Sequence, residues 1–355
     1  MSNPDRRIAP LLVGCAGLSP SDDEIALFAE MQPFGFILFA RNVRDPDQVR
    51  ALCAALRRSV GRPDAPVLID QEGGRVARLG PPHWPSLPGA AAIGALWRRD
   101  GDAGLDAAYW HGRALGAMLA DLGITIDCTP VLDIAVPGAD PVIGDRAFCD
   151  DPEGVAALGQ RQCLGLLDAG VLPVLKHMPG HGRASVDSHQ TLPVIEASAE
   201  TLEKTDFVPF RTIAAFHFAR NLWGMVAHVV YSGIDADNAA SVSPTVVRKI
   251  LRGHMDFRGT LIADDIGMGA LEGSIAQRYR AVLDAGVNLA LHCSGDFDEM
   301  RALAAIETES AGDVWLRWRG THAFLAERRD AAQLISVDDA RQQLDALLAG
   351  TTRPA

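Results

Sequence analysis

Residues 172–182 read LPVLKHMPGHG, an apolar segment that leads directly into a charged, glycine-containing stretch. The segment Leu172–Leu175 has the composition of a strand buried on both faces. Lys176 and His177 follow where that strand should end. In parallel α/β barrels the functional residues lie at the carboxyl ends of the strands. This stretch therefore predicts a parallel α/β fold with its functional site at that end.

Segments of the same kind recur along the chain. We predict eight strands: Leu11–Gly14, Gly35–Phe39, Val67–Ile69, Ile124–Thr129, Leu172–Leu175, Met225–Val229, Thr260–Ala263 and Asn288–His292. Helical patterns lie between most of them: Ser21–Met31, Pro46–Arg58, Leu105–Leu122, Pro152–Ala169, Ala199–Phe218, Pro244–His254 and Ser274–Ala285. This alternation predicts an α/β protein with parallel strands and outer helices. Eight strands, with no glycine-rich phosphate turn after the first, favour a (β/α)₈ TIM-type barrel over an open dinucleotide-binding sheet.

The chain of 355 residues could hold two average domains, but a barrel can occupy this length alone. No linker, low-complexity tract or repeat interrupts it. We therefore expect a single domain over residues 1–355, with a core at about 8–296 and a charged helical tail at 297–355. Two tail segments, Val314–Arg328 and Ser336–Leu348, are predicted to be helices that cover the barrel.

Composition excludes several classes of partner. The net charge of −12 argues against nucleic acid or an anionic membrane, which require clustered positive charge. The six cysteines show no CxxC spacing, so reduced thiols in the cytoplasm are the simplest interpretation. The apolar run at residues 8–17 resembles a short export signal, but Pro10 and its length favour a first buried strand. No stretch reaches the roughly 18–20 apolar residues of a membrane span.

Ionisable residues follow at least four of the predicted strands. These polar stretches are DQEGGRVAR at 70–78, IGDR at 143–146, KHMPGHG at 176–182 with DSH at 187–189, and Asp264 with Asp265. A single polar loop is explained by capping alone. Repeated acids, bases and histidines at one end of a barrel instead predict an active site there.

These residue types suit retaining glycoside hydrolysis, which needs a carboxylate nucleophile and a group that protonates the leaving oxygen. Asp264 or Asp265 could supply the nucleophile, because one of two consecutive residues at a strand end faces the barrel mouth. The proton donor could be another carboxylate. It could also be His189, if Asp187 orients the imidazole and stabilises its charged form.

The stretch KHMPGHG followed by DSH resembles the family 3 glycoside hydrolases, specifically bacterial β-N-acetylhexosaminidases of the peptidoglycan-recycling, NagZ type. Four further segments agree and occur in the family's order: GFILFARN at 35–42, DQEGGRVARL at 70–79, PVIGDRAF at 141–148 and LIADDIGM at 261–268. The tail beyond Phe297 matches no motif of the family.

The resemblance implies a role for each matching residue. Asp264 is expected to be the nucleophile, and His189 the acid/base with Asp187 as its partner. The expected sugar-binding residues are Asp70, Arg78, Arg146, Lys176 and His177. The implied substrates are small carbohydrates, N-acetylglucosaminyl-anhydromuramoyl peptides from cell-wall turnover in the cytoplasm. The resemblance implies no metal and no organic cofactor, and we expect a monomer.

Two departures and three alternatives stay open. Met178 replaces the family's usual Phe, and Ala263 replaces the Ser or Thr before the nucleophile, which leaves rate and fine specificity open. A phosphorylase of the same family would use phosphate in place of water, which a histidine acid/base repels less than a carboxylate does. A β-glucosidase is disfavoured because the large second domain of many such enzymes is absent. A non-catalytic sugar-binding barrel would require loss of Asp264 or of the Asp187/His189 dyad, and all three residues are present.

Several polar residues have a structural interpretation. We expect Asp265 to cap a helix, His181 to brace its loop and Arg75 to form an ion pair at the barrel mouth. Asp133 and Asp145 are expected to hold loops or the Arg146 guanidinium. Lys176 could form no more than an interior ion pair with Asp70. Glu72 is the substitute acid/base if His189 does not fill that role.

Overall fold

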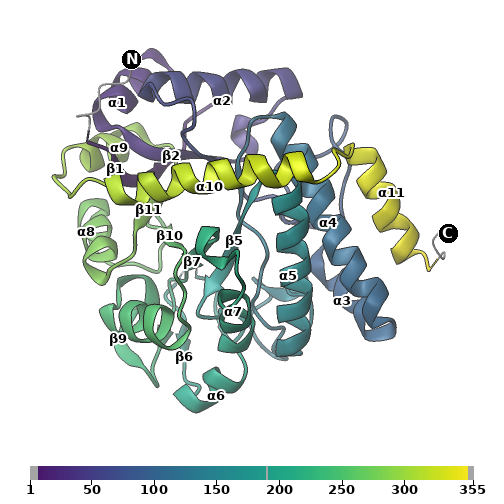
Figure 1. The fold of residues 1–355 in the computed structure, drawn as a ribbon. Coiled ribbons are helices and arrows are strands. Elements are labelled where there is room, and N and C mark those ends of the chain that lie inside the picture. The colour runs from purple at the N-terminus through teal and green to yellow at the C-terminus, as the bar shows by residue number, and fades with distance from the viewer. Residues whose placement is uncertain (1–6, 189–190, 351–355) are drawn as a thin grey trace.

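The computed structural model describes residues 7–188 and 191–350 and contains a closed barrel of eight strands (Figure 1). The strands are β1 (Ala9–Val13), β2 (Pro33–Leu38), β3 (Val67–Ile69), β4 (Ile126–Asp127), β5 (Leu172–Met178), β7 (Trp223–Val226), β10 (Thr260–Asp265) and β11 (Leu289–His292). Around the barrel they run β1-β11-β10-β7-β5-β4-β3-β2, and every neighbouring pair is parallel. The predicted TIM-type barrel is confirmed.

A ring of helices surrounds the strands. Its α-helices are α1 (Asp22–Met31), α2 (Pro46–Val60), α3 (Ala90–Arg99), α4 (Gly101–Asp121), α5 (Pro152–Asp168), α6 (Ala199–Lys204), α7 (Phe207–Ala214), α8 (Ile275–Ala285) and α9 (Phe297–Ala304). A wide π-type helix, η5 (Val246–His254), precedes β10. Local sequence fixes many of the ends: Ser21 and Glu24 form a capping box at α1, and Asp45 caps α2 ahead of Pro46. Helix α3 is an addition that periodicity did not predict.

One continuous helix was predicted at Ala199–Phe218, but the segment contains two helices, so the prediction of a single helix is wrong. Helix α6 ends at Lys204 and α7 begins at Phe207. At the break, the buried Asp206 carboxylate accepts hydrogen bonds from Arg183 Nε at 2.6 Å and Thr205 Oγ1 at 2.7 Å. Pro209 lies in the first turn of α7, where a missing N–H costs nothing. The break therefore ties the helix layer to the loop that follows β5.

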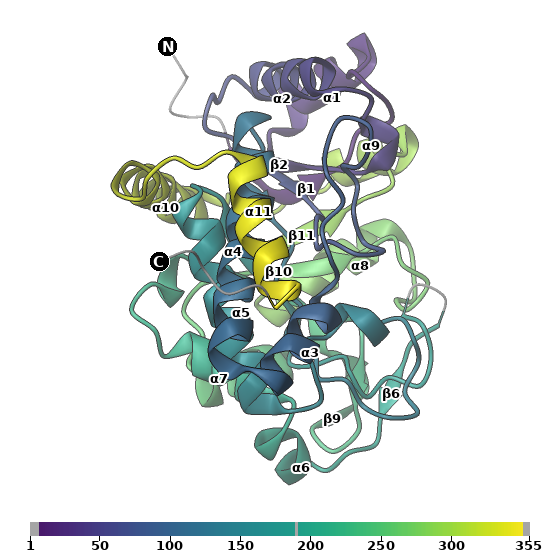
Figure 2. The same cartoon turned by 90° about the vertical axis from the view of Figure 1, so that its right-hand side faces the viewer.

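The two tail helices occupy different positions. Helix α10 (Gly312–Ala331) crosses the amino end of the barrel, where the Trp315 ring lies 5.5 Å from Phe34 of β2 and the Trp318 ring 5.9 Å from Trp223 of β7 (Figure 1). Helix α11 (Val337–Leu348) packs on α4 and α3, one layer further out (Figure 2). Only α10 covers the barrel itself. Helix α9 packs against α8 and α1 and completes the ring.

A small sheet at the carboxyl end of the barrel was not predicted. It joins β6 (Val194–Ile195), β8 (Val230–Tyr231) and β9 (Asp235–Ala239). Strand β8 pairs with β6 in parallel and with β9 in antiparallel orientation. The sheet links the loop after β5 to the loop after β7, so two loops over the barrel mouth share one support. In the part of the chain that the structure describes, no helix combines the length and apolarity that crossing a membrane requires.

Candidate active site

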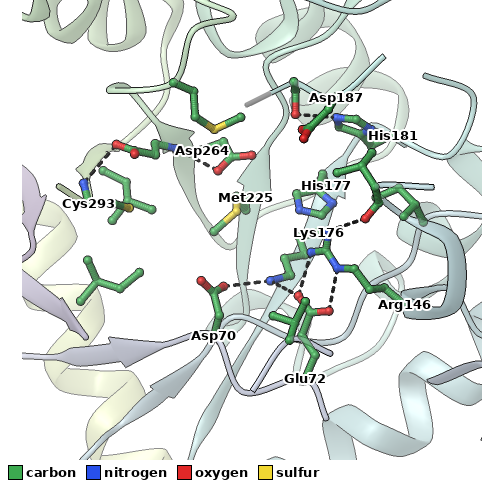
Figure 3. A pocket seen from close by; sticks show the side chains of 18 of the residues that line it. Asp70, Glu72, Arg146, Lys176, His177, His181, Asp187, Met225, Asp264 and Cys293 are labelled. Carbon is green, nitrogen blue, oxygen red and sulfur yellow. Dashed lines mark hydrogen bonds and ion pairs between the residues drawn. The ribbon is translucent and has the colours of Figure 1, made fainter. Parts of the chain in front are cut away.

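A cavity of about 320 Å³ opens at the carboxyl ends of the strands (Figure 3). Seven of the predicted site residues line it: Asp70, Arg78, Arg146, Lys176, His177, Asp187 and Asp264. They come from segments up to 194 positions apart in the chain, Asp70 to Asp264, which only the closed barrel brings together. His189, the predicted acid/base, lies outside the described residues. Within those residues, no group of three or more His, Cys, Asp or Glu side chains is placed to hold a metal ion.

Lys176 of β5 is the centre of an ionic network on one side of the cavity (Figure 3). Its side chain is 2% exposed, and its Nζ lies 3.0 Å from Asp70 Oδ1 and 2.6 Å from Glu72 Oε1. Burial alone would lower the pKa of Lys176, but the charges of Asp70 and Glu72 outweigh it and raise the pKa above its usual value. Lys176 therefore stays positively charged, and salt screens its buried ion pairs only slightly.

Two arginines complete the network. Arg146 holds Glu72 through both carboxylate oxygens, each at 2.8 Å, and Arg78 Nη2 lies 3.1 Å from Asp70 Oδ2. Burial would raise the pKa values of Asp70 and Glu72, yet the cations around them hold both pKa values below their usual range. Glu72, kept ionised by Lys176 and Arg146, is poorly suited to donate a proton. The network instead presents fixed donors and acceptors of the kind that bind sugar hydroxyls.

Asp133 organises the turn after β5. Its buried carboxylate lies 2.6 Å from His177 Nδ1 and accepts the His181 backbone N–H at 2.6 Å. Burial would raise the pKa of Asp133, but His177 holds it below its usual value. The His177 ring is thus fixed at the cavity wall. The expected structural role of Asp133 is confirmed.

His181 connects this turn to the loop that carries Asp187. Its Nε2 lies 3.0 Å from Ser188 Oγ, and burial, aided by nearby His177, lowers the pKa of His181 to about 4. A neutral imidazole in this position braces the loop, as expected. Arg75 does the same for the loop at 141–146: its Nε lies 2.6 Å from Asp145, and its Nη2 donates to the carbonyls of residues 141–143. Both braces hold predicted site residues in place.

The two aspartates that end β10 have different environments (Figure 3). Asp264 accepts the Asp265 backbone N–H at Oδ1, at 2.9 Å. Asp265 accepts the backbone N–H groups of Gly267 and Cys293 at its own Oδ1, each at 3.0 Å. Burial raises the pKa of Asp265, whereas these bonds lower it in part. Asp265 was expected to cap a helix, and this is wrong: α8 begins at Ile275 with Ser274 as its cap.

Two residues of this region were not predicted to belong to the site. Glu72 was considered only as a substitute acid/base, although it lies two positions after Asp70 and pairs with both Lys176 and Arg146. His228, fully buried, lies behind the nucleophile candidate with Nε2 3.0 Å from the Asp265 carbonyl oxygen and Nδ1 2.6 Å from Ser241 Oγ. It stands alone in the apolar run 225–231, which gave no polar signal.

Known proteins share this architecture. The model of the glycosyl hydrolase family 3 N-terminal domain matches residues 5–312. A β-hexosaminidase of Aromatoleum aromaticum is 38% identical over 292 residues, covering 81% of this chain and 80% of the relative. One of Xylella fastidiosa strain M12 is also 38% identical, covering 87% and 91%. The crystal structure of NagZ from Neisseria gonorrhoeae in complex with N-trifluoroacetyl-D-glucosamine matches 98% of this chain and 100% of its own, at 30% identity and a TM-score of 0.84. The chain therefore belongs to glycosyl hydrolase family 3, together with the β-hexosaminidases of the NagZ type.

Proposed function

We propose that this enzyme is a retaining exo-β-N-acetylglucosaminidase that removes a terminal β-linked N-acetylglucosamine. The observation that carries the proposal is the placement of Asp264 on the same cavity as the Asp70–Lys176–Glu72–Arg146 network. A carboxylate at the end of β10 can attack a sugar carbon while the network binds the hydroxyls of the same ring. The names of the relatives and the N-acylated glucosamine in the neisserial structure support this substrate class.

The proposed reaction has two steps. First, an Asp264 oxygen bonds to the anomeric carbon while the bond to the leaving oxygen breaks, and the His189 imidazolium gives its proton to that oxygen. Water then attacks the anomeric carbon, passes its proton to the imidazole and releases Asp264 as a carboxylate. Asp187 lines the cavity two positions before His189, which supports its proposed part in orienting the ring.

The finer assignments follow the same argument. A cavity of about 320 Å³ suits one monosaccharide, which favours attack on a terminal residue rather than an internal one. We propose N-acetylglucosaminyl-anhydromuramoyl peptides as the substrates, the cytoplasm as the compartment and a monomer as the active form. All six cysteines are free, and five of them are buried, which is consistent with a reducing compartment.

A 5-fluoro N-acetylglucosaminyl donor with an activated leaving group, which keeps the acetamido group at C2, tests the nucleophile. Because fluorine slows the second step, the covalent intermediate should accumulate, and peptide mass spectrometry should place the label on Asp264. A label on Asp265 or Glu72, or none under conditions that inactivate the enzyme, would refute the assignment. Turnover that requires added phosphate would identify a phosphorylase instead.

The acid/base proposal needs a separate test, because a proton donor matters most for a poor leaving group. His189→Ala should slow cleavage of the natural disaccharide far more than that of an aryl glycoside. With the aryl substrate, azide should restore turnover by replacing the water that has lost its base. Equal losses on both substrates, without rescue by azide, would move the role to another residue.

A further inference from the structure

The end of β10 is held by more contacts than a strand end needs. Asp265 is held at four points: its Oδ1 accepts two backbone N–H groups, from Gly267 and Cys293, and its carbonyl oxygen accepts the Met268 N–H at 3.0 Å and lies 3.0 Å from His228 Nε2. Its remaining polar backbone atom, the N–H, donates to Asp264 Oδ1 at 2.9 Å. The carbonyl group, the side chain and the N–H group are all attached to the Asp265 Cα, so holding the first two limits where the N–H can lie.

We propose that His228 is a positioning residue for catalysis: through the Asp265 carbonyl it helps to fix the backbone of Asp265, whose N–H holds the Asp264 carboxylate in its attacking orientation. The inference rests on the proposed role of Asp264 as the nucleophile. His228 acts through Asp265 and lies outside the residues that line the cavity.

Hydrogen-bond chemistry determines the tautomer of His228. A carbonyl oxygen only accepts, so Nε2 carries the proton that bonds to Asp265. In the neutral ring Nδ1 must then accept, and the Ser241 hydroxyl, 2.6 Å away, is the donor. The ring is fully buried, and burial lowers the pKa of His228, so the neutral form is favoured. The Asp265 carbonyl thus selects the tautomer, and the Ser241 hydroxyl satisfies the other ring nitrogen.

The small sheet supplies the support for this pair. The Ser241 backbone N–H donates to the Ala227 carbonyl at 3.1 Å, and the Ala240 backbone N–H donates to the Val229 carbonyl at 2.8 Å. These two bonds join the segment after β9 to the segment that carries His228. Without β8 and β9, the loop after β7 would have no partner on that side. The sheet therefore contributes to the geometry of the β10 end, although none of its strands belongs to the barrel.

Two substitutions separate the hydrogen bond to Asp265 from packing. A glutamine amide nitrogen reaches about as far as Nε2, whereas an asparagine amide reaches only as far as Nδ1. His228→Gln can therefore still donate to Asp265, and His228→Asn can contact only Ser241. The probe is the 5-fluoro donor, because its inactivation rate constant reports attack by the nucleophile and its inhibition constant reports binding.

We expect His228→Asn to lower the inactivation rate constant about 10- to 100-fold, the size of effect that a small misplacement of a reacting group produces. The inhibition constant should stay near the wild-type value, and His228→Gln should recover most of the rate. His111→Asn is the matched control, because His111 is also fully buried and also bonds through both nitrogens, to Pro88 O at 3.0 Å and Gln162 at 2.9 Å. It should lower the melting temperature without changing the rate constant.

The inference is wrong if His228→Asn and His228→Gln have equal rate constants, or if His111→Asn loses as much as His228→Asn. If His228→Asn does not fold, Ser241→Ala decides: release of Nδ1 should slow inactivation several-fold, and an unchanged rate overturns the inference. Labelling of the wild-type enzyme separates the two proposals. A label elsewhere than Asp264 defeats the proposed function, whereas a label on Asp264 at unchanged rates in the variants defeats only the role of His228.

Discussion

The two ends of the barrel are built from the same eight strands and differ almost completely in chemistry. At the carboxyl end, Asp70, Glu72, Lys176 and Arg146 form a buried ionic network. At the amino end, aromatic rings from β2, β7 and α10 pack edge to face in an apolar layer. Aromatic packing adds stability directly, whereas buried ion pairs recover little more than the cost of removing their charges from water. From this contrast we expect stability to depend mainly on the amino end and the proposed activity on the carboxyl end.

Asp264→Asn tests that division with the largest expected effect. The amide cannot form the glycosyl ester, so turnover should fall on the order of 10⁴-fold or more. The melting temperature should change little, because the amide oxygen can still accept the Asp265 N–H. The measurements are kcat on nitrophenyl β-N-acetylglucosaminide and a thermal unfolding curve. Residual activity close to wild type, or unfolding of the variant, would contradict the division.

At the amino end we expect the opposite result: Trp318→Ala should reduce stability without reducing activity. The ring is 1% exposed, and its N–H donates to the Asp64 carbonyl at 2.7 Å. Its removal should lower the free energy of unfolding by about 3–5 kcal/mol and leave kcat of the folded enzyme unchanged. Leu316→Ala, at a 64% exposed position of the same helix, is the control and should cost less than about 0.5 kcal/mol. A parallel loss of kcat in Trp318→Ala would mean that the ends are coupled.

Lys176→Met refines the comparison, because it should reduce both the stability of the fold and the activity. Loss of the cation leaves part of the Asp70 and Glu72 charge unpaired, which should cost about 3 kcal/mol in unfolding free energy at neutral pH. It should also raise KM, since a donor at the cavity wall is gone. The exposed pair Lys204–Glu200 supplies the control: Lys204→Met should cost less than about 1 kcal/mol.

The pH dependence of that penalty has a definite sign. Asp70 and Glu72 have pKa values below their usual range in the fold, so their contribution is complete above the unfolded values of about 3.9 and 4.3. It is lost as pH falls through the lower, folded values. The difference between wild type and Lys176→Met in urea unfolding should therefore shrink below about pH 4. A difference that is constant from pH 7 to pH 3 would exclude the ionic explanation.

Asp127→Asn should give the smallest effect, and a favourable one. Asp127 is fully buried; its Oδ1 accepts the Gln71 N–H at 2.9 Å, and its Oδ2 has no hydrogen-bond partner among the described residues. Burial, with repulsion from Asp70 and Glu72, raises its pKa. The unfolded chain therefore gains from ionising Asp127 above about pH 4. The neutral amide should add on the order of 1 kcal/mol at pH 7 and nothing near pH 3.5 in denaturant titrations. A loss at pH 7 would show that the charged form is paired.

The strands could be predicted because each carries its own signal. A segment buried on both faces is mostly apolar, as Val67–Ile69 and the first four residues of β5, 172–175, show. The small sheet gave no such signal: β6 and β8 have two residues each, and β9 reads DADNA, which composition assigns to a loop. The predicted ends of the strands also differ from the observed ones: β7 begins at Trp223 rather than at the predicted Met225.

The candidate site divides along the same line. Asp264 and Lys176 stand out in the sequence because they directly follow apolar strands, whereas Arg78 was expected only from the family resemblance. The pairing of Glu72 with Arg146 could not be found, because the two residues are 74 positions apart and only the closed barrel joins them. His228 has no signal at all in sequence, since a neutral, fully buried imidazole looks like one more residue of an apolar run.

The position of α10 also has a consequence for synthesis. Phe34 and Trp223 are made long before residues 312–331, the segment that covers them. At about 5–20 residues per second, the nearly 300 residues after Phe34 take roughly 15 to 60 seconds to emerge. Until residues 312–331 are made, the aromatic residues that already exist lack their cover, which leaves an apolar surface that chaperones or other chains can bind. Slower decoding of the last hundred codons should therefore reduce the yield of native enzyme more than slower decoding of the first hundred.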